Sequence, residues 1–330
     1  MASIPRLILP DVIYQVRAEA ARNEKIFEDD LYKIQFLKIL ETKLKTHFFQ
    51  CYAYSLENNH YHLALRTGSI TISKFLQKIN STFARYYNKK KRTRGAVFSR
   101  PFTSIVIEEK TYLKDLVRYI HLNPIRNKSC SIEKLDNYQW CGHSNLCKES
   151  SNTFQNTLHI LSAFTSDNPH SSYNNFIRNG FSNNDPLILQ IRKANSGKQK
   201  FADPCHQVAG SKEFTEWAIS ENRSRKMRIP RYQSEKVTLE NIHTTIENFL
   251  HLRSGELFHQ GRKNLRSTAR ELFAYVARYQ FDYSGVSIAE YLKKTDSAVS
   301  RMLSRFELND KKVNMVEQIE ELICKNAVPI

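Results

Sequence analysis

Two histidines that flank a single residue are the strongest chemical signal in this sequence. They lie in Asn59-His60-Tyr61-His62-Leu63, at the start of an apolar run. Side chains on a β-strand alternate between its faces, so His60 and His62 point to one face and Tyr61 to the other. Two imidazoles side by side can hold one divalent cation, whereas a single histidine on an apolar strand is usually a core residue.

A second constellation lies in Arg118-Tyr119-Ile120-His121-Leu122-Asn123-Pro124. On a helix, Tyr119 and Asn123 are one turn apart and share a face. Tyrosines are frequent in the chain, and Tyr86, Tyr87 and Tyr112 compete for the same role, but the polar Asn123 beside a helix-ending proline distinguishes Tyr119. The pattern suggests attack on a phosphodiester by the Tyr119 oxygen, assisted by a cation because a phenol with a pKa of about 10 is a poor nucleophile.

The third ligand of the expected metal site is an oxygen, because a site built only from nitrogen and thiolate would favour zinc. The amide of Asn123 fits this requirement. We therefore expect Mg²⁺ or Mn²⁺ as the cofactor, held by His60, His62 and Asn123. Such a cation polarises the scissile phosphate and offsets the charge that develops during the reaction.

The charge of the chain favours a polyanionic partner. It carries 50 Lys and Arg against 33 Asp and Glu, a formal net charge of +17 over 330 residues. Nucleic acid is the first candidate, and a protein that is merely basic is the alternative. No stretch approaches the roughly 20 apolar residues that span a membrane, and residues 1–10 do not resemble a signal peptide. We expect a cytoplasmic, nucleoid-associated protein without a membrane partner.

The six cysteines are expected to be reduced thiols. Cys141-Gly142-His143 together with Cys147 superficially resembles half of a zinc site. It lacks a CxxC pair and a matching second half, so we interpret these cysteines as structural.

Hydrophobic periodicity predicts an α+β first domain. The elements follow the order β-α-β-β-α-β-α, which matches the split βαβ, ferredoxin-like pattern with an added terminal helix. The histidine strand would then be central, and the added helix could pack beside it. The expected strands are 12–19, 48–55, 61–66 and 102–108, and the expected helices are 29–48, 73–90 and 109–122.

The rest of the chain is predicted to be helical. Serine and asparagine become common after residue 150, and a basic tether without apolar periodicity surrounds Pro230. Helices are expected at 237–252 and 264–279, and the short helices 287–292 and 297–306 form a predicted helix-turn-helix. The expected domains are residues 1–148 (catalytic), 149–236 (connecting) and 237–330 (helix-turn-helix).

Basic and polar side chains are expected to contact DNA at three places. One is the end of the helix 73–90, where basic residues alternate with aromatic ones; the others are the segment after Asn123 and the second helix of the helix-turn-helix. A basic helix end is more often simply solvated. The candidates are Arg85, Lys89, Lys90, Arg92, Arg94, Arg100, Arg126, Ser297, Ser300, Arg301 and Arg305.

Together these motifs resemble the REP-associated tyrosine transposases, a branch of the single-tyrosine HUH transposase superfamily. The resemblance spans roughly residues 5–148 and rests on Asn59-His60-Tyr61-His62-Leu63, Gly95-Ala96-Val97-Phe98, Tyr119-Ile120-His121-Leu122-Asn123-Pro124-Ile125-Arg126 and Asn137-Tyr138-Gln139-Trp140. It implies a ferredoxin-like catalytic domain in which His60 and His62 bind the metal, Tyr119 is the nucleophile and Asn123 completes the metal site.

The resemblance also implies a reaction and a substrate. Such enzymes cleave single-stranded DNA near hairpin-forming repeats and leave a 5′-phosphotyrosine and a free 3′-hydroxyl. Rejoining reverses this transesterification. The expected partners are single-stranded and hairpin DNA, and the expected assembly is a monomer or homodimer.

Residues 240–308 are similar to the DNA-binding domain of the bacterial chromosomal replication initiator. This chain has Asp296 where the initiator has a histidine near the start of its recognition helix. An acidic side chain repels phosphate, so the domain would tether the enzyme to duplex DNA or read another sequence. A non-catalytic DNA-binding regulator that uses only this domain is the main alternative. A replication initiator or relaxase would share the chemistry, but the chain shows neither a helicase nor a larger clamping domain.

Overall fold

The fold is described from a computed structural model of the chain. It describes residues 6–68, 70–99, 102–147, 154–164, 167–180, 187, 189, 191, 204–234, 237–259, 265–281, 283–306 and 310–326. They form two compact units: one holds the chain up to Ile219 except for residues 68–70, and the other holds those three residues and Ser220–Ile330. Within these ranges, no helix is both long and apolar enough to cross a lipid bilayer.

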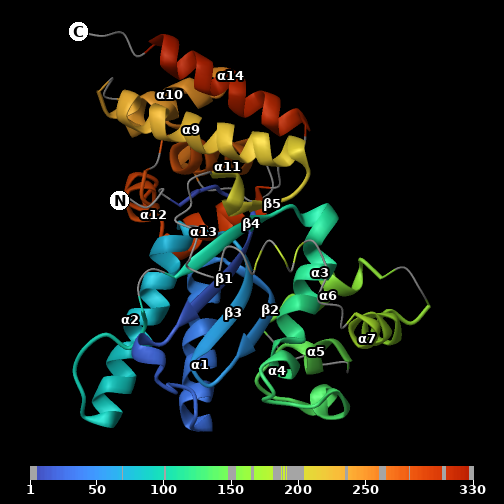
Figure 1. The fold of residues 1–330 in the computed structure, drawn as a ribbon. Coiled ribbons are helices and arrows are strands. Elements are labelled where there is room, and N and C mark those ends of the chain that lie inside the picture. The colour runs from blue at the N-terminus through green and yellow to red at the C-terminus, as the bar shows by residue number, and fades with distance from the viewer. Residues whose placement is uncertain are drawn as a thin grey trace. The chain divides into compact units, whose positions relative to one another are not determined.

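A five-stranded sheet forms the centre of the first unit (Figure 1). Its strands lie in the order β2-β3-β1-β4-β5. The first four pair antiparallel, whereas β5 pairs parallel with β4. The strands are β1 (Ile13–Glu19), β2 (Gln50–Leu56), β3 (His60–Arg66), β4 (Thr103–Ile107) and β5 (Val208–Ala209).

Two long helices, α1 (Asp30–His47) and α2 (Ile72–Lys91), pack on one face of the sheet. Each begins at a side chain that accepts a backbone N–H: Asp29 from Leu31 and Thr71 from Lys74. Aromatic rings fill the interface. Phe36 of α1 lies 4.7 Å from the Tyr61 ring and 5.5 Å from the Phe83 ring of α2, centroid to centroid. This packing fixes Tyr61, and therefore the orientation of β3.

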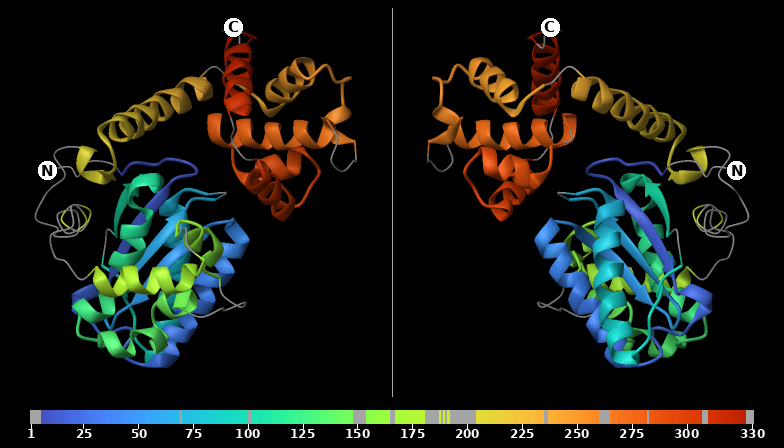
Figure 2. Two further views of the ribbon diagram at one scale, coloured as in Figure 1. Left: turned by 90° about the vertical axis from the view of Figure 1, so that its right-hand side faces the viewer. Right: turned by 90° about the vertical axis from the view of Figure 1, so that its left-hand side faces the viewer.

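The opposite face of the sheet is covered by α3 (Glu109–His121). Its apolar residues Leu116 and Ile120 are fully buried in one cluster with Ala64 and Ile105 of the sheet. Shorter helices extend this core: α4 (Asn123–Arg126), α5 (His143–Cys147), α6 (Thr157–Leu161) and α7 (Pro169–Asn179), with 3₁₀ segments at Ala21–Asn23, Ile132–Asn137 and Pro204–Gln207. Figure 2 shows this unit from two sides.

In the part of the second unit that the structure describes, every secondary-structure element is helical. Its core includes Ile246, Phe273, Ile288, Val299 and Ile319. The helix α9 (Lys212–Ser234) leads into it, and α10 (Leu239–Phe249), α11 (Leu265–Tyr275), α12 (Gly285–Tyr291), α13 (Asp296–Arg305) and α14 (Asp310–Asn326) follow. A 3₁₀ turn occupies Glu256–Phe258, and a π-helical turn at Val276–Gln280 extends α11.

The observed fold differs from the sequence expectation at three places. The basic stretch expected to be a tether without apolar periodicity is helical, as part of α9. A fifth strand, β5, lies within the segment expected to connect the domains. The chain continues into a new turn, α4, which begins at Asn123. Pro124 is accommodated in its first turn because the N–H that a proline lacks would have no intrahelical acceptor there.

Candidate active site

The register between β1 and β3 places His60 and His62 on the face covered by α3. Arg17 pairs with His62 and Glu19 pairs with His60, so their side chains project to the same face. The two imidazole rings lie 5.2 Å apart, centroid to centroid, at 80°. Tyr61 points to the other face, among the aromatic rings below α1 and α2. The predicted alternation of this strand is therefore observed.

Both imidazoles are held in the neutral form. His60 is 7% exposed and His62 is 2% exposed. Burial, and then the charge of Arg17, lowers the pKa of His60 to about 4. Burial lowers the pKa of His62 well below its usual value, and His60, Arg17 and Arg126 add to this effect. A neutral imidazole is the form that binds a metal ion, so the pair is ready for ligation at neutral pH.

Tyr119 is carried to the histidines by α3. Its ring lies edge-to-face against His62, with centroids 5.7 Å apart, and the residue is 6% exposed. Arg126 of α4 places its guanidinium carbon 4.9 Å from the centre of the Tyr119 ring. It also donates a hydrogen bond of 2.6 Å from Nη1 to the Tyr119 backbone oxygen. A phenol thus lies between a neutral imidazole and a cation.

The competing tyrosines lie elsewhere. Tyr86 and Tyr87 belong to α2, on the other face of the sheet, where both contact the ring of Tyr32. Tyr112 lies on α3 but is packed against the hydrophobic core two turns before Tyr119. Only Tyr119, among these four, has a ring contact with the histidine pair in the described structure.

Asn123 begins α4 and is 5% exposed. Its backbone oxygen accepts the N–H of Asn127 at 3.0 Å. Its side-chain Nδ2 is buried and has no hydrogen-bond partner among the described residues. An amide binds a metal ion through its oxygen, so Asn123 Oδ1, one turn after Tyr119, would be the third ligand atom of a two-histidine site. Two imidazoles and one amide fit Mn²⁺ or Mg²⁺ with open positions for phosphate oxygen.

Amide side chains orient both imidazoles. His60 Nδ1 lies 2.7 Å from Asn59 Oδ1, so Nδ1 carries the proton and Nε2 keeps its lone pair for a cation. His62 Nδ1 lies 3.1 Å from Gln15 Nε2, and Gln15 Oε1 is buried without a hydrogen-bond partner among the described residues. If Gln15 accepts through Oε1, the proton of His62 lies on Nδ1, as in His60, and Nε2 is free to bind a cation. If Gln15 donates through Nε2, the proton lies on His62 Nε2 and blocks ligation there. Gln15 therefore controls whether His62 can bind metal.

Sequence reasoning missed Gln15 and Arg17. Both lie on β1, at every second position, opposite the histidine strand. The alternation of residues 12–19 was a signal for a strand, but which of its side chains face His62 depends on the pairing register. That register joins residues more than 40 positions apart and is not encoded locally.

The basic residues at the end of α2 are exposed, as DNA contact would require. This group comprises Arg85, Lys89, Lys90, Arg92 and Arg94. Arg92 ends the helix in a left-handed conformation with φ 55°. Arg100 lies outside the described residues, and Arg126 lies half-buried beside Tyr119 rather than on the surface.

The second helix of the predicted helix-turn-helix is α13. Thr295 caps its N-terminus, because the Thr295 hydroxyl oxygen accepts the Ala298 N–H at 3.2 Å. Ser297, Arg301 and Arg305 are exposed on it. Ser300 is only 1% exposed. Because its hydroxyl is buried, Ser300 cannot contact DNA directly in this conformation, and we remove it from the expected contacts.

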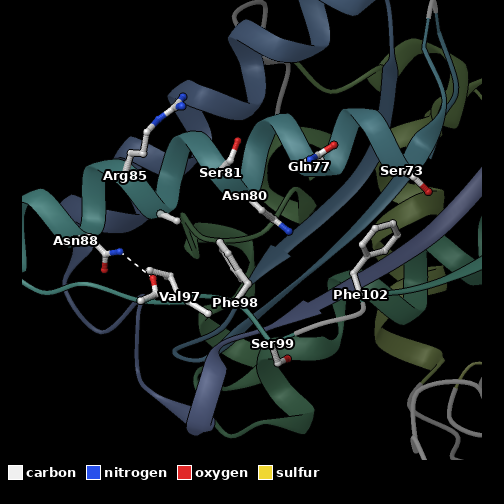
Figure 3. Close-up of a pocket in the computed structure, with 13 residues that line it drawn as sticks. Ser73, Gln77, Asn80, Ser81, Arg85, Asn88, Val97, Phe98, Ser99 and Phe102 are labelled. Carbon is white, nitrogen blue, oxygen red and sulfur yellow. Dashed lines mark hydrogen bonds between the residues drawn. The ribbon is translucent and has the colours of Figure 1, made fainter.

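A cavity of about 580 Å³ lies between α2 and residues 95–102 (Figure 3). Asn80 points from α2 toward Phe98, and Asn88 donates a hydrogen bond of 3.0 Å to the backbone oxygen of Gly95. Gly95 has φ 121°, which side-chain-bearing residues rarely adopt. The rim is tied to the end of β1 because Ser99 N donates to Glu19 O at 2.8 Å. Since Glu19 pairs with His60, this rim and the histidines lie at the same end of the strands β1 and β3.

Comparison with known proteins points to one family. Residues 10–123 match the family model described as "Transposase IS200 like". No curated protein matches the chain. Among solved structures, the chain is similar to one described as "Structure of the REP associates tyrosine transposase bound to a REP hairpin", with 13% identity, coverage of 47% of this chain and 90% of that chain, and a TM-score of 0.38. The family match supports a transposase-like first unit and includes both histidines, Tyr119 and Asn123.

The role of Gln15 can be tested with two substitutions of similar size. Gln15→Glu provides only acceptor oxygens and keeps the proton on His62 Nδ1, so we expect Mn²⁺ affinity to be retained or increased. Gln15→Leu removes the partner, and loss of such an orienting contact costs about 10–100-fold in metal affinity. Isothermal titration of each variant with Mn²⁺ measures the difference. Equal affinities in both variants would contradict the assignment.

The neutral state of His60 predicts an acid-sensitive fold in the absence of metal. Above about pH 6.5 the residue is neutral both folded and unfolded, so it contributes no pH dependence. Below that value the unfolded chain binds a proton that the folded chain takes up only near its pKa of about 4. The free energy of unfolding therefore falls as the pH drops between these values, by at most about 1.4 kcal/mol per pH unit.

Urea denaturation in EDTA at several pH values measures this slope. His60→Asn should flatten it, whereas the same substitution at the exposed His206 should leave it unchanged. An unchanged slope in His60→Asn would show that His60 titrates normally.

Proposed function

We propose that the first unit is a ferredoxin-like HUH catalytic domain that cleaves and rejoins single-stranded DNA through Tyr119. The contact between the Tyr119 and His62 rings, with His60 beside them, carries the proposal. The match of residues 10–123 to the IS200-like transposases supports the same chemistry. The order of elements from β1 to β4, β-α-β-β-α-β, supports the ferredoxin-like topology.

The reaction is a transesterification. The Tyr119 hydroxyl loses its proton and its oxygen attacks the phosphorus of a DNA phosphodiester. The bond from phosphorus to the 3′-oxygen breaks, and that oxygen takes up a proton. The products are a 5′-phosphotyrosine and a free 3′-hydroxyl. Attack of a 3′-hydroxyl on the phosphotyrosine reverses these steps, so the enzyme needs no nucleotide cofactor.

His60, His62 and Asn123 would hold Mg²⁺ or Mn²⁺ in this proposal. The bound cation supplies Lewis-acid polarisation of the phosphate. Burial keeps the two imidazoles neutral, and Asn59 keeps the proton of His60 away from Nε2. His60 thereby presents a lone pair to this position, and His62 does the same when the Gln15 amide turns its oxygen toward Nδ1.

Arg126 and Arg17 add positive charge to the same site. Arg126 lies over the Tyr119 ring, where a cation favours the deprotonated phenol and offsets charge on the phosphate during attack. Arg17 lies opposite His62, and its ion pair with Glu19 of the same strand holds the guanidinium on the histidine face of the sheet. Both residues stabilise the anionic substrate without taking part in proton transfer.

The DNA strand is proposed to cross the end of the strands β1 and β3 at which the histidines lie. The exposed basic residues at the end of α2 neutralise phosphates of the hairpin or of its single-stranded flank. The cavity beside α2 combines aromatic rings with the amides of Gln77, Asn80 and Asn88, which suits an unstacked base.

The second unit is proposed to bind duplex DNA through α12 and α13, which would form a helix-turn-helix. Arg301 and Arg305 supply exposed charge on α13. Asp296 in the first turn of α13 opposes phosphate contact at that end. We therefore expect this unit to tether the enzyme rather than to read the sequence that the replication initiator recognises.

The nucleophile can be tested with labelled single-stranded oligonucleotides that carry the hairpin repeats flanking the gene. Tyr119→Phe should abolish the covalent protein–DNA adduct, because the attacking oxygen is gone, while hairpin binding stays within about threefold of the original, a change worth less than 1 kcal/mol. Tyr112→Phe, on the same helix, is the matched control and should form the adduct normally. Denaturing gels and mass spectrometry of the adduct give the readout.

An adduct formed by Tyr119→Phe would refute this assignment. EDTA should stop cleavage by the original chain, and Mn²⁺ or Mg²⁺ should restore it. Tight duplex binding by the original chain without any adduct would favour the alternative, a DNA-binding regulator.

Binding by the second unit is tested with Arg301→Ala and Arg305→Ala. Each should weaken duplex binding about equally for all sequences and reduce the slope of log affinity against log salt by about 1, as loss of one phosphate contact does. Arg253→Ala, exposed elsewhere in this unit, is the charge-matched control. Fluorescence anisotropy across a salt series measures the slopes. Identical slopes in all three variants would exclude α13 as the duplex-binding helix.

A further inference from the structure

Three metal-ligating side chains converge away from the proposed active site. Asp136 lies in the 3₁₀ segment Ile132–Asn137, and His143 and Cys147 are one turn apart on α5. Asp136 Oδ1 lies 3.0 Å from His143 Nε2, and Cys147 Sγ lies 3.1 Å from the same nitrogen. All three ligand atoms lie within 4.8 Å of one another. Four-coordinate zinc holds such atoms about 3.4–3.6 Å apart, so small shifts suffice.

Hydrogen bonding at His143 would make these two contacts share one ring nitrogen. A neutral imidazole nitrogen has either one proton or one lone pair, directed along a single line. Nε2 of His143 therefore cannot serve Asp136 and Cys147 fully at once. A Cys-His-Asp catalytic relay is also excluded, because its two partners would lie on different ring nitrogens. A cation between the three atoms satisfies all of them.

The surroundings prepare His143 as a ligand. Its Nδ1 lies 2.8 Å from Tyr173 Oη, which leaves Nε2 facing the other two side chains. His143 is fully buried, and burial lowers its pKa, so the ring is neutral. Arg178 donates to Asp136 Oδ2 at 2.8 Å, which orients the carboxylate and leaves Oδ1 toward His143.

We propose that Asp136 Oδ1, His143 Nε2 and Cys147 Sγ bind one Zn²⁺, with water in the fourth position. A set of one oxygen, one nitrogen and one sulfur suits tetrahedral Zn²⁺ and is unsuited to Mg²⁺, which prefers six oxygens. The donor set also differs from the thiolate-free set proposed for catalysis. The Asp136 side chain is 29% exposed, so water can reach the site.

The zinc site would brace the helix that carries the nucleophile. Tyr173 of α7 contacts both His143 Nδ1, at 2.8 Å, and His121 Nδ1, at 2.7 Å. His121 is the last residue of α3, two positions after Tyr119. A metal ion at α5 would thus hold in place a buried series of hydrogen-bonded side chains, which runs from His143 through Tyr173 to His121 at the end of α3. Its role is positional, because none of the three ligands contacts the histidine pair in the described structure.

Sequence reasoning rejected a zinc site here because Cys141-Gly142-His143 and Cys147 lacked a second half. The further ligand in this proposal is Asp136, which precedes His143 by seven residues and lies on the 3₁₀ segment Ile132–Asn137. Cys141 is not a ligand: its Sγ lies 4.0 Å from the backbone oxygen of His121. The proposed triad therefore shares only His143 and Cys147 with the apparent motif.

Titration of the full chain with Co²⁺, a spectroscopic substitute for Zn²⁺, tests the proposal. The original chain should show a thiolate-to-cobalt charge-transfer band and tetrahedral d–d bands, and Zn²⁺ should abolish both. His60→Ala should retain the bands, because the catalytic site has no thiolate. Cys147→Ser should lose the charge-transfer band, and Cys130→Ser, a half-buried cysteine outside the cluster, should keep it.

Asp136→Asn preserves the shape of the side chain and keeps the thiolate, so it guards against a folding artefact in Cys147→Ser. It should retain the charge-transfer band and weaken Zn²⁺ binding at least about tenfold. Zn²⁺ should also raise the melting temperature of the original chain but not of Cys147→Ser. Absence of the band in the original chain, or its persistence in Cys147→Ser, would overturn the proposal.

Discussion

The antiparallel pairing of β1 with β3 is the constraint on which the site depends. It sets Arg17 opposite His62 and brings Gln15 to the same face, within hydrogen-bonding distance of that imidazole. A shift of one residue would turn both histidines toward the aromatic layer under α1 and α2. Tyr61 prevents such a shift, because its ring is fully buried against Phe36 and its hydroxyl donates to Asn80 Oδ1 at 2.7 Å. Hydrophobic packing on one face of β3 thus fixes which residues, His60 and His62, project from the other face.

Burial performs a second task at the site. It keeps the imidazoles neutral while two guanidinium groups remain charged beside them, so lone pairs and positive charge coexist within a few residues. An exposed pair would titrate near neutrality and bind protons in competition with a cation. The hydrophobic cluster beneath α3 therefore helps to keep the imidazole pKa values low and also stabilises the fold.

The hydrophobic periodicity of the sequence predicted the strands and the helix that carry the proposed site residues. Strand alternation located β1 and β3 within one residue, and the 3.6-residue period located α3 within one residue. These periods placed His60 and His62 on one face of a strand and Tyr119 on a helix, whereas the contact between the His62 and Tyr119 rings depends on how the helix packs on the sheet. Gln15 and Asp136 did not, because each acts through a contact set by tertiary packing. The short β5 has too few residues for any pattern, and α9 lacks the apolar stripe by which a helix is recognised.

The two residues of β5 determine where the first folding unit can be cut. Val208 and Ala209 pair with Val106 and Ile107, and they cover the outer edge of β4. A polypeptide that stopped at residue 148 would leave an unpaired edge strand, open to association with other chains. It would also lose Tyr173 and Ile177 from the core beneath α3. A segment of about sixty residues that carries none of the proposed catalytic groups therefore supplies both the partner of this edge and part of the core of the first unit.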